Sequence, residues 1–310
     1  MISRPARFRA VLVEGSAAAV PGPSSFPDYT RPVPAERIAE SLAFINWTVL
    51  TALGVGSFAA VVAGRTLTEA TRGYLAFTAF SAGAFALLAA FADLGLPVLS
   101  PELAVRADPA WEGPRRLALV ALPVLAAVYG VALVRGRAAR PVAVAGLAAG
   151  ALALLGGAFS WGGGGLDSAL LLVELAGLAA VLGGVWAAMV LGHWYLVTPR
   201  LPEAPLVRFA RWLGLALAVQ LGLFVAWLGF GAGPAGAPAF AALVGPWALF
   251  VWLRLLVGLV FPLVVSWAAI QTARSRSMES ATGLLYINVG TIAAGTILAA
   301  GLYFGAGLLV

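Results

Sequence analysis

Long apolar runs, separated by short polar or glycine- and proline-rich stretches, fill most of this sequence. The runs lie at 41–63, 74–97, 116–134, 141–160, 168–192, 207–230, 245–272 and 281–308. About 20 apolar residues in an α-helix span the hydrocarbon core of a bilayer, so each run is long enough for one crossing. The pattern predicts an all-α, polytopic membrane helix bundle with about eight transmembrane helices.

The residues before the first run differ from the rest of the chain. Arginine and proline recur through 1–40, and no apolar stretch of the kind found in a signal peptide follows the early arginines. We therefore expect 1–40 to be an extended, non-membrane N-terminal tail and 41–310 to be the transmembrane domain. Within that domain, the glycine- and proline-rich stretch 231–245 is expected to be a loop.

Composition agrees with a membrane protein and adds an orientation. Hydrophobic residues make up 62% of the chain and charged residues 10%, against about 25% charged in soluble domains. The net charge of +6 does not indicate nucleic-acid binding, because the arginines lie between apolar runs. They concentrate after the first, third, fifth and seventh runs, and cytoplasmic loops retain positive charge. The loop between the second and third runs also carries Arg106, Arg115 and Arg116, but Glu102, Asp108 and Glu112 offset them there. We expect a multi-pass protein of a bacterial-type inner membrane, in contact with the lipid bilayer, with both termini outside.

The missing residue types limit the cofactors that this chain could hold. It has no cysteine, no lysine and one histidine, His193. Cysteine-ligated iron–sulfur clusters and a Schiff base to retinal are therefore excluded on this chain. Haem is disfavoured too, because Met189 lies one turn from His193 on the same predicted helix and cannot reach the opposite face of a haem. Any such redox centre belongs to a partner.

Four polar residues fall at membrane depth toward the predicted outer side, on four different helices: Asn46, Asp93, Glu174 and Arg254. An unpaired charge at that depth costs about 2.5–3.5 kcal/mol or more. We therefore expect Arg254 to pair with Glu174 or Asp93. Two interpretations stay open: an ion pair that fixes the packing of the bundle, or a polar pocket open to the outer face that binds a carbonyl-bearing ligand and passes protons.

A second, weaker group of candidates lies toward the predicted inner side. His193 closes the fifth run together with Trp194 and Tyr195, and Tyr286 opens the eighth run. Aromatic residues at helix ends usually form an interfacial belt. His193 could instead titrate near physiological pH. The pattern leaves both interpretations open.

Three features are expected to shape the packing. Gly146 with Gly150, and Gly301 with Gly305, are small-xxx-small pairs that allow close helix contact. Pro262 is expected to kink the seventh helix. Gln220 is expected to form an interhelical hydrogen bond.

The first two runs resemble a known family. Trp47 is followed by LTALGVGSFAAVVAGR, and the second run ends in Asp93-Leu94-Gly95-Leu96-Pro97. These features are similar to those of the quinol-interacting membrane subunits of the polysulfide reductase (NrfD-like) type. The second helix of that family often ends in Asp-Leu-Gly-x-Pro, commonly with arginine at x, where this chain has Leu96.

The resemblance implies a membrane anchor subunit of a respiratory oxidoreductase complex. Such a subunit is non-catalytic or quinone-reactive, and exchanges electrons between menaquinone or ubiquinone and an iron–sulfur protein subunit docked outside, with a catalytic subunit beyond it. Asp93 matches the family motif, whereas Asn46, Glu174 and Arg254 are candidates by depth alone. The alternative function is a membrane transporter or proton-pathway protein that uses Arg254, Glu174 and His193. A third possibility is a structural role for the charges.

Overall fold

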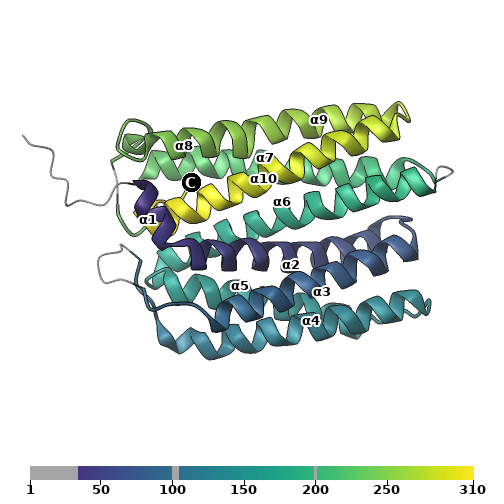
Figure 1. Cartoon of the computed structure of the whole chain (residues 1–310), viewed down its shortest axis with the longest axis horizontal. Helices are drawn as coiled ribbons and strands as arrows, with labels where there is room; N and C mark the ends of the chain where they lie inside the picture. The colour runs from purple at the N-terminus through teal and green to yellow at the C-terminus, as the bar shows by residue number, and fades with distance from the viewer. Residues whose placement is uncertain (1–33, 100–104, 199–200, 237) are drawn as a thin grey trace, which may run out of the picture. The chain divides into compact units, whose positions relative to one another are not determined.

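A computed structural model describes residues 34–99, 105–198, 201–236 and 238–310. Within these ranges the regular structure is helical and contains no β-strand. Eight of the described helices are long and apolar enough to cross a membrane, and they run side by side as one bundle (Figure 1). The predicted all-α polytopic membrane bundle is confirmed.

Each spanning helix corresponds to one predicted apolar run, with ends that differ by a few residues. The helices are α2 (Leu42–Leu67), α3 (Arg72–Leu94), α4 (Glu112–Val134), α5 (Arg140–Trp161), α6 (Gly165–Val197), α7 (Ala204–Phe230), the continuous span of α8 (Ala248–Leu255), η3 (Leu256–Val260) and α9 (Phe261–Arg274), and α10 (Met278–Ala306). Short 3-10 turns, η1 (Pro109–Trp111) and η2 (Ala241–Leu243), lie in the connections before α4 and α8. The stretch 231–245 is therefore mainly a loop, as predicted.

The last part of the predicted extended tail is helical instead. Helix α1 (Pro34–Glu40) begins with a proline, which suits the first helical position because its missing N–H would have had no partner there. Ile38 lies against Gly301 of α10, so the short helix covers one end of that span. The rest of the predicted tail, 1–33, lies outside the described residues.

Two groups of four spans meet along α2 and α6. Helices α2–α5 form one group and α6–α10 the other, with α2 and α6 side by side between them (Figure 1). Their backbones nearly touch: a Cβ atom added to Gly56 would lie 1.8 Å from the carbonyl oxygen of Ala179, and one added to Gly183 would lie 2.2 Å from the backbone nitrogen of Ser57. This contact holds the two halves together through close backbone packing, which replaces the hydrophobic drive that lipid does not supply.

The predicted small-residue pairs also pack as expected. Gly146 and Gly150 of α5 face Phe58 and Val55 of α2 so closely that a Cβ atom would lie 2.4 Å and 3.0 Å from those side chains. On α10, Gly301 and its partner one turn later receive α1 and the loop before α8. Both pairs are therefore packing surfaces.

A π-helical turn precedes Pro262, the residue expected to kink the seventh helix. The π turn, Leu256–Val260, is separated from the proline by one residue, and the proline lacks the backbone N–H that a helix residue normally donates. The side chain of Asn288 on α10 donates a hydrogen bond to the carbonyl oxygen of Pro262 at 3.2 Å. The distorted region is thus fastened to the neighbouring span.

We call the end of the bundle at which α2 begins the α1 end, and the opposite end the far end. The connections after α2, α4, α6 and α9 lie at the far end, because the spans alternate in direction. Described arginines there are Arg65, Arg72, Arg135, Arg137, Arg140, Arg208, Arg211, Arg274 and Arg276. That the far end is cytoplasmic remains a prediction from this distribution.

Candidate functional site

A buried ion pair links the end of α3 to the first turn of α4. Asp93 is 1% exposed and Arg115 is 4% exposed. The Nε atom of Arg115 lies 2.6 Å from Oδ1 of Asp93. Two charges without access to water are tolerated only when they are paired and hydrogen-bonded, and here each satisfies the other.

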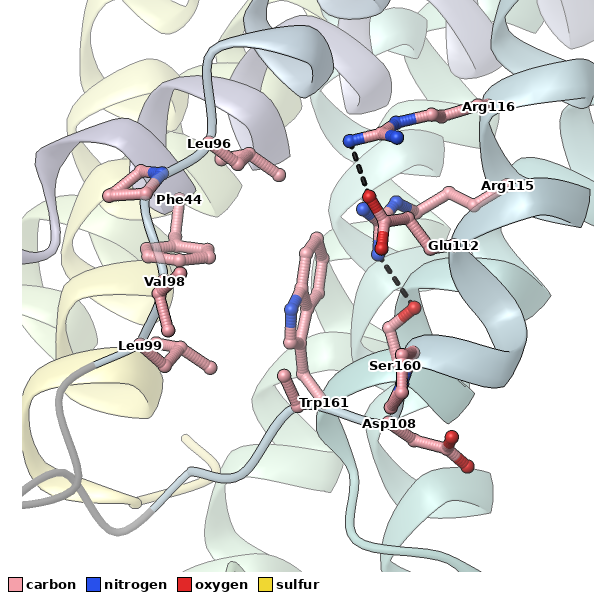
Figure 2. Close-up of a pocket in the computed structure, with 13 residues that line it drawn as sticks. Phe44, Leu96, Val98, Leu99, Asp108, Glu112, Arg115, Arg116, Ser160 and Trp161 are labelled. Carbon is pink, nitrogen blue, oxygen red and sulfur yellow. Dashed lines mark hydrogen bonds and ion pairs between the residues drawn. The ribbon is translucent and has the colours of Figure 1, made fainter.

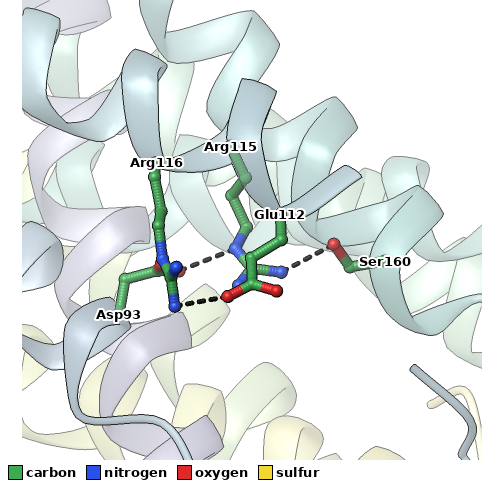
Figure 3. A network of polar contacts seen from close by, with 5 residues as sticks. All are labelled: Asp93, Glu112, Arg115, Arg116 and Ser160. Atoms are coloured by element: carbon green, nitrogen blue, oxygen red, sulfur yellow. Dashed lines mark hydrogen bonds and ion pairs between the residues drawn. The ribbon is translucent and has the colours of Figure 1, made fainter. Parts of the chain in front are cut away.

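Asp93 binds a second arginine through its other carboxylate oxygen. Arg116 places its Nε 3.1 Å from Oδ2 of Asp93, and its Nη2 lies 2.5 Å from Oε1 of Glu112. Arg115 in turn donates from Nη1 to Oγ of Ser160 at the end of α5, at 2.6 Å. Figure 3 shows the resulting network, which connects three spans and contains two carboxylates and two guanidinium groups.

Aromatic rings hold the Arg115 guanidinium from the other side. Its Cζ atom lies 4.5 Å from the ring centroid of Trp161 and 5.8 Å from that of Trp47. The two indoles pack edge to face, with centroids 4.6 Å apart. A cation over an indole face is stabilised by the negative charge of that face. The position of the guanidinium is therefore fixed by carboxylate, hydroxyl and aromatic contacts together.

The loop before α4 explains why these side chains meet. Oδ1 of Asp108 accepts a hydrogen bond from the backbone N–H of Ala110 at 2.9 Å and caps the turn η1, which leads directly into α4. The backbone N–H of Asp108 donates to the carbonyl oxygen of Ser160 at 2.7 Å, so the loop is tied to the end of α5. With α4 beginning at Glu112, its first turns direct Arg115 and Arg116 toward Asp93.

A cavity of about 180 Å³ adjoins this network at the α1 end. Its lining residues are Phe44, Leu96, Pro97, Val98, Leu99, Ala107, Asp108, Pro109, Glu112, Arg115, Arg116, Ser160 and Trp161. Figure 2 shows Leu96, Val98 and Leu99 on one side and the two arginines on the other, with the indole of Trp161 between them. The volume is below the roughly 300–1,000 Å³ of sites for drug-sized ligands, so it suits a small ring with one or two hydrogen-bond acceptors.

Glu174 and Arg254 form a second cluster. The Nη2 atom of Arg254 lies 3.7 Å from Oε1 of Glu174, and both residues are at most 4% exposed. Arg254 also donates to Oε1 of Gln220 at 3.4 Å and to the carbonyl oxygen of Val310 at 3.3 Å. The predicted pairing of Arg254 with Glu174 and the predicted interhelical hydrogen bond of Gln220 are confirmed. Asp93, the other partner considered for Arg254, binds Arg115 and Arg116 instead.

Asn46 belongs to neither cluster. Its side chain is exposed, whereas Ile45 and Trp47 on either side are buried. Successive residues of a helix are rotated by about 100°, so similar depth does not place side chains on the same face. The four residues expected from their depth to form one outer cluster are therefore divided. Asp93 pairs with Arg115 and Arg116, and Glu174 pairs with Arg254. Asn46 is exposed and joins neither pair.

His193 and Tyr286 do come together, at the far end. The hydroxyl of Tyr286 lies 3.5 Å from Nδ1 of His193, and both side chains are exposed. Among the described residues, the hydrogen bonds and ion pairs do not connect this pair to Arg254. On α10, Asn288 is the buried polar residue closest in sequence to Tyr286. It still lies about 10 Å along the helix from Gly295, which lies beside Arg254.

The sequence interpretation missed several residues of the site. The loop assignment of Arg115, Arg116 and Glu112 is wrong, and the sequence pattern assigns no role to Ser160 or Trp161. A signal is present, because Asp108-Pro109 is a helix-start pattern and places both arginines inside the helix that follows. A buried Asp93 also requires a counter-charge, and the arginines at the start of that helix can supply it.

Comparisons with known protein families, with curated proteins and with solved structures give no match for this chain.

Proposed function

We propose that this chain is the quinone-binding integral membrane subunit of a respiratory oxidoreductase complex. The observation that carries the proposal is the cavity at the α1 end, which combines an aliphatic and aromatic wall with two fixed guanidinium groups. A quinone ring is flat and apolar with a carbonyl at each end. A pocket for it needs apolar walls and a hydrogen-bond donor near a carbonyl.

Each part of the cavity has a distinct role in this proposal. Trp161, Leu96 and Val98 would contact the ring faces and exclude water. Arg116 is the donor with access to the cavity, because it is 41% exposed at the side chain, whereas Arg115 is 5% exposed and already donates from Nε to Asp93 and from Nη1 to Ser160. Asp93 is a positioning residue, since it binds both arginines but does not line the cavity.

A bound quinol supplies two electrons and two protons when it is oxidised. Glu112 lines the cavity and is 41% exposed at the side chain, so its carboxylate can accept the two protons one after the other and pass each to water. The electrons would leave to an iron–sulfur protein subunit, since the chain has no cysteine to hold such a cluster.

The docking side of that partner, and of a catalytic subunit beyond it, is proposed to be the α1 end. Leu94 and Val98 beside the cavity are 67% and 97% exposed, which supports an apolar contact there. Under the predicted orientation, in a bacterial-type inner membrane, this is the outer side.

Two measurements test the proposal. The first is quinone titration of the purified protein by calorimetry. The Arg116→Gln variant is expected to raise Kd about tenfold, the loss of roughly 1.4 kcal/mol for one charged hydrogen bond. Ala107→Trp, which narrows the cavity from an exposed loop position, is expected to weaken binding further. Arg211→Gln at the far end is the control with the same charge change. Unchanged affinity in both cavity variants would overturn the proposal.

The second measurement identifies the proteins that copurify in mild detergent. An iron–sulfur protein that is retained by the wild type and lost after Leu94→Glu, a change at an exposed residue that does not line the cavity, supports the anchor role. Purification of the chain alone, with full quinone affinity, would contradict the complex while leaving the binding site intact.

A further inference from the structure

A second hollow lies within the predicted membrane region, between the two halves of the bundle. It is a groove of about 350 Å³ formed by α2, α5, α6 and α7. Apart from the indole N–H of Trp212, its lining side chains carry no polar group: Val55, Gly56, Ala59, Ala60, Ala63, Leu154, Ala176, Ala179, Ala180, Gly184, Phe209, Trp212, Leu213 and Ala216. A bound water needs two to four polar partners, so a hydrocarbon is the fitting occupant.

The groove follows from the close contact of α2 with α6. The backbones approach at Gly56 and Gly183, and the neighbouring alanines are too small to fill the space beside that contact. From Val55 to Ala63 the groove extends about 12 Å along α2. One leaflet of the hydrocarbon core is about 15 Å thick, so the groove matches most of an acyl chain in a single leaflet.

A polar hollow lies next to the groove, toward the far end of the bundle. It has a volume of about 440 Å³ and is lined by Thr66, Leu67, Thr68, Glu69, Ala204, Pro205 and Arg208. The two hollows are lined by neighbouring residues on two helices: Ala63 and Phe209 line the groove, whereas Thr66 and Arg208 line the polar hollow. Arg208 donates to the carbonyl oxygen of Leu67 and so bridges the end of α2 to the start of α7.

The charge at this hollow favours an anion. Arg208 and Arg211 are both exposed in the first two turns of α7, where the positive end of the helix dipole adds to their charge. Glu69 also lines the hollow, whereas Glu203 is paired with Arg276 at 2.7 Å. Arg208 and Arg211, which follows it by three residues on α7, therefore outnumber the one lining carboxylate.

We propose that the groove and the neighbouring polar hollow together form a binding site for an anionic phospholipid, with one acyl chain in the groove and the headgroup phosphate at Arg208. The hydroxyls of Thr66 and Thr68 lie in the same hollow but donate to the carbonyl oxygens of Val62 and Gly64, so the guanidinium of Arg208 is the donor to the phosphate. Cytoplasmic leaflets are rich in anionic lipids, in agreement with the predicted cytoplasmic position of the far end. The site is separate from the cavity at the α1 end, so it does not depend on quinone binding.

The test is thermal unfolding of the purified, delipidated protein with added phosphatidylglycerol or phosphatidylcholine. Wild type is expected to gain more stability from phosphatidylglycerol. Arg208→Gln should remove that difference. Gly184→Leu should also remove the extra stabilisation by phosphatidylglycerol. A Cβ atom at this position meets no neighbouring atom within 4 Å, so the leucine side chain can extend into the groove and occupy it.

Two matched variants make the result specific. Arg137→Gln removes an exposed arginine at the same end of the bundle, and Gly222→Leu adds a leucine at an exposed, uncrowded glycine of α7 outside the groove. Both are expected to respond to phosphatidylglycerol as wild type does. Equal stabilisation by the two lipids, or a full response in Arg208→Gln, would overturn the proposal. So would loss of a copurifying membrane protein in Gly184→Leu with the lipid response intact, since the groove would then bind a partner helix.

Discussion

The carboxylate of Asp93 lies 2.6 Å from Nε of Arg115, and both side chains are buried. This contact joins α3 to α4 at the α1 end and positions the guanidinium against the indole of Trp161. The pair therefore shapes the cavity wall, although Asp93 is outside the cavity. Its contribution to folding can be measured separately from its contribution to ligand binding.

Removing the charge of Asp93 should destabilise the protein strongly. In Asp93→Asn, the buried Arg115 keeps its charge without a counter-charge, which typically costs about 3–5 kcal/mol. Glu112→Gln breaks an ion pair that is 41% exposed on both sides and should cost less than about 1 kcal/mol. The free energy of unfolding in mixed micelles distinguishes the two. If the free energy of unfolding falls by a similarly small amount in both variants, water reaches the Asp93–Arg115 pair and the account of a buried pair is wrong.

The pair of Arg254 and Glu174 should behave as a structural unit. Each single variant, Arg254→Met or Glu174→Leu, leaves one buried charge unpaired and is expected to lose about 3 kcal/mol or more. The double variant removes both charges and should recover most of that loss. The measurement is a double-mutant cycle on the free energy of unfolding.

The same variants test the transporter alternative. If Arg254 and Glu174 carry ions or protons, the double variant should fold well and yet abolish a transport activity in proteoliposomes. We expect quinone binding at the α1 end to be unchanged in the double variant, because neither residue lines that cavity.

Adjacent glycines on α6 should respond in opposite ways to the same substitution. Gly183→Ala places a methyl group 2.2 Å from the backbone of α2, where no side chain can move aside, and should cost about 3 kcal/mol or prevent folding. Gly184→Ala meets no atom within 4 Å and should be neutral or slightly stabilising, because alanine favours helix. The yield of monodisperse protein in size-exclusion chromatography compares them directly. Equal yields would show that the two halves separate more easily than the contact implies.

The sequence predicts the spans well because each apolar run is a local signal. Gln220 and the small-residue pairs are also predicted correctly, since a buried amide or a missing side chain has a local consequence. The site is harder to predict, because rotation about each helix axis decides which side chains meet. Asn46 shows this at one extreme, exposed between two buried neighbours. Arg115 is the opposite case: the sequence pattern places it in a loop, and the structure buries it in the first turn of α4.

The most direct test of the central claim is photolabelling with an azido-quinone, followed by mapping of the labelled peptides by mass spectrometry. The account predicts labels in 96–99, 107–116 and 160–161, the segments that contain most of the residues lining the cavity at the α1 end. Excess unlabelled quinone should suppress them, and Ala107→Trp should reduce them. Labels confined to the region of His193 and Tyr286, or labels that excess quinone does not reduce, would contradict it.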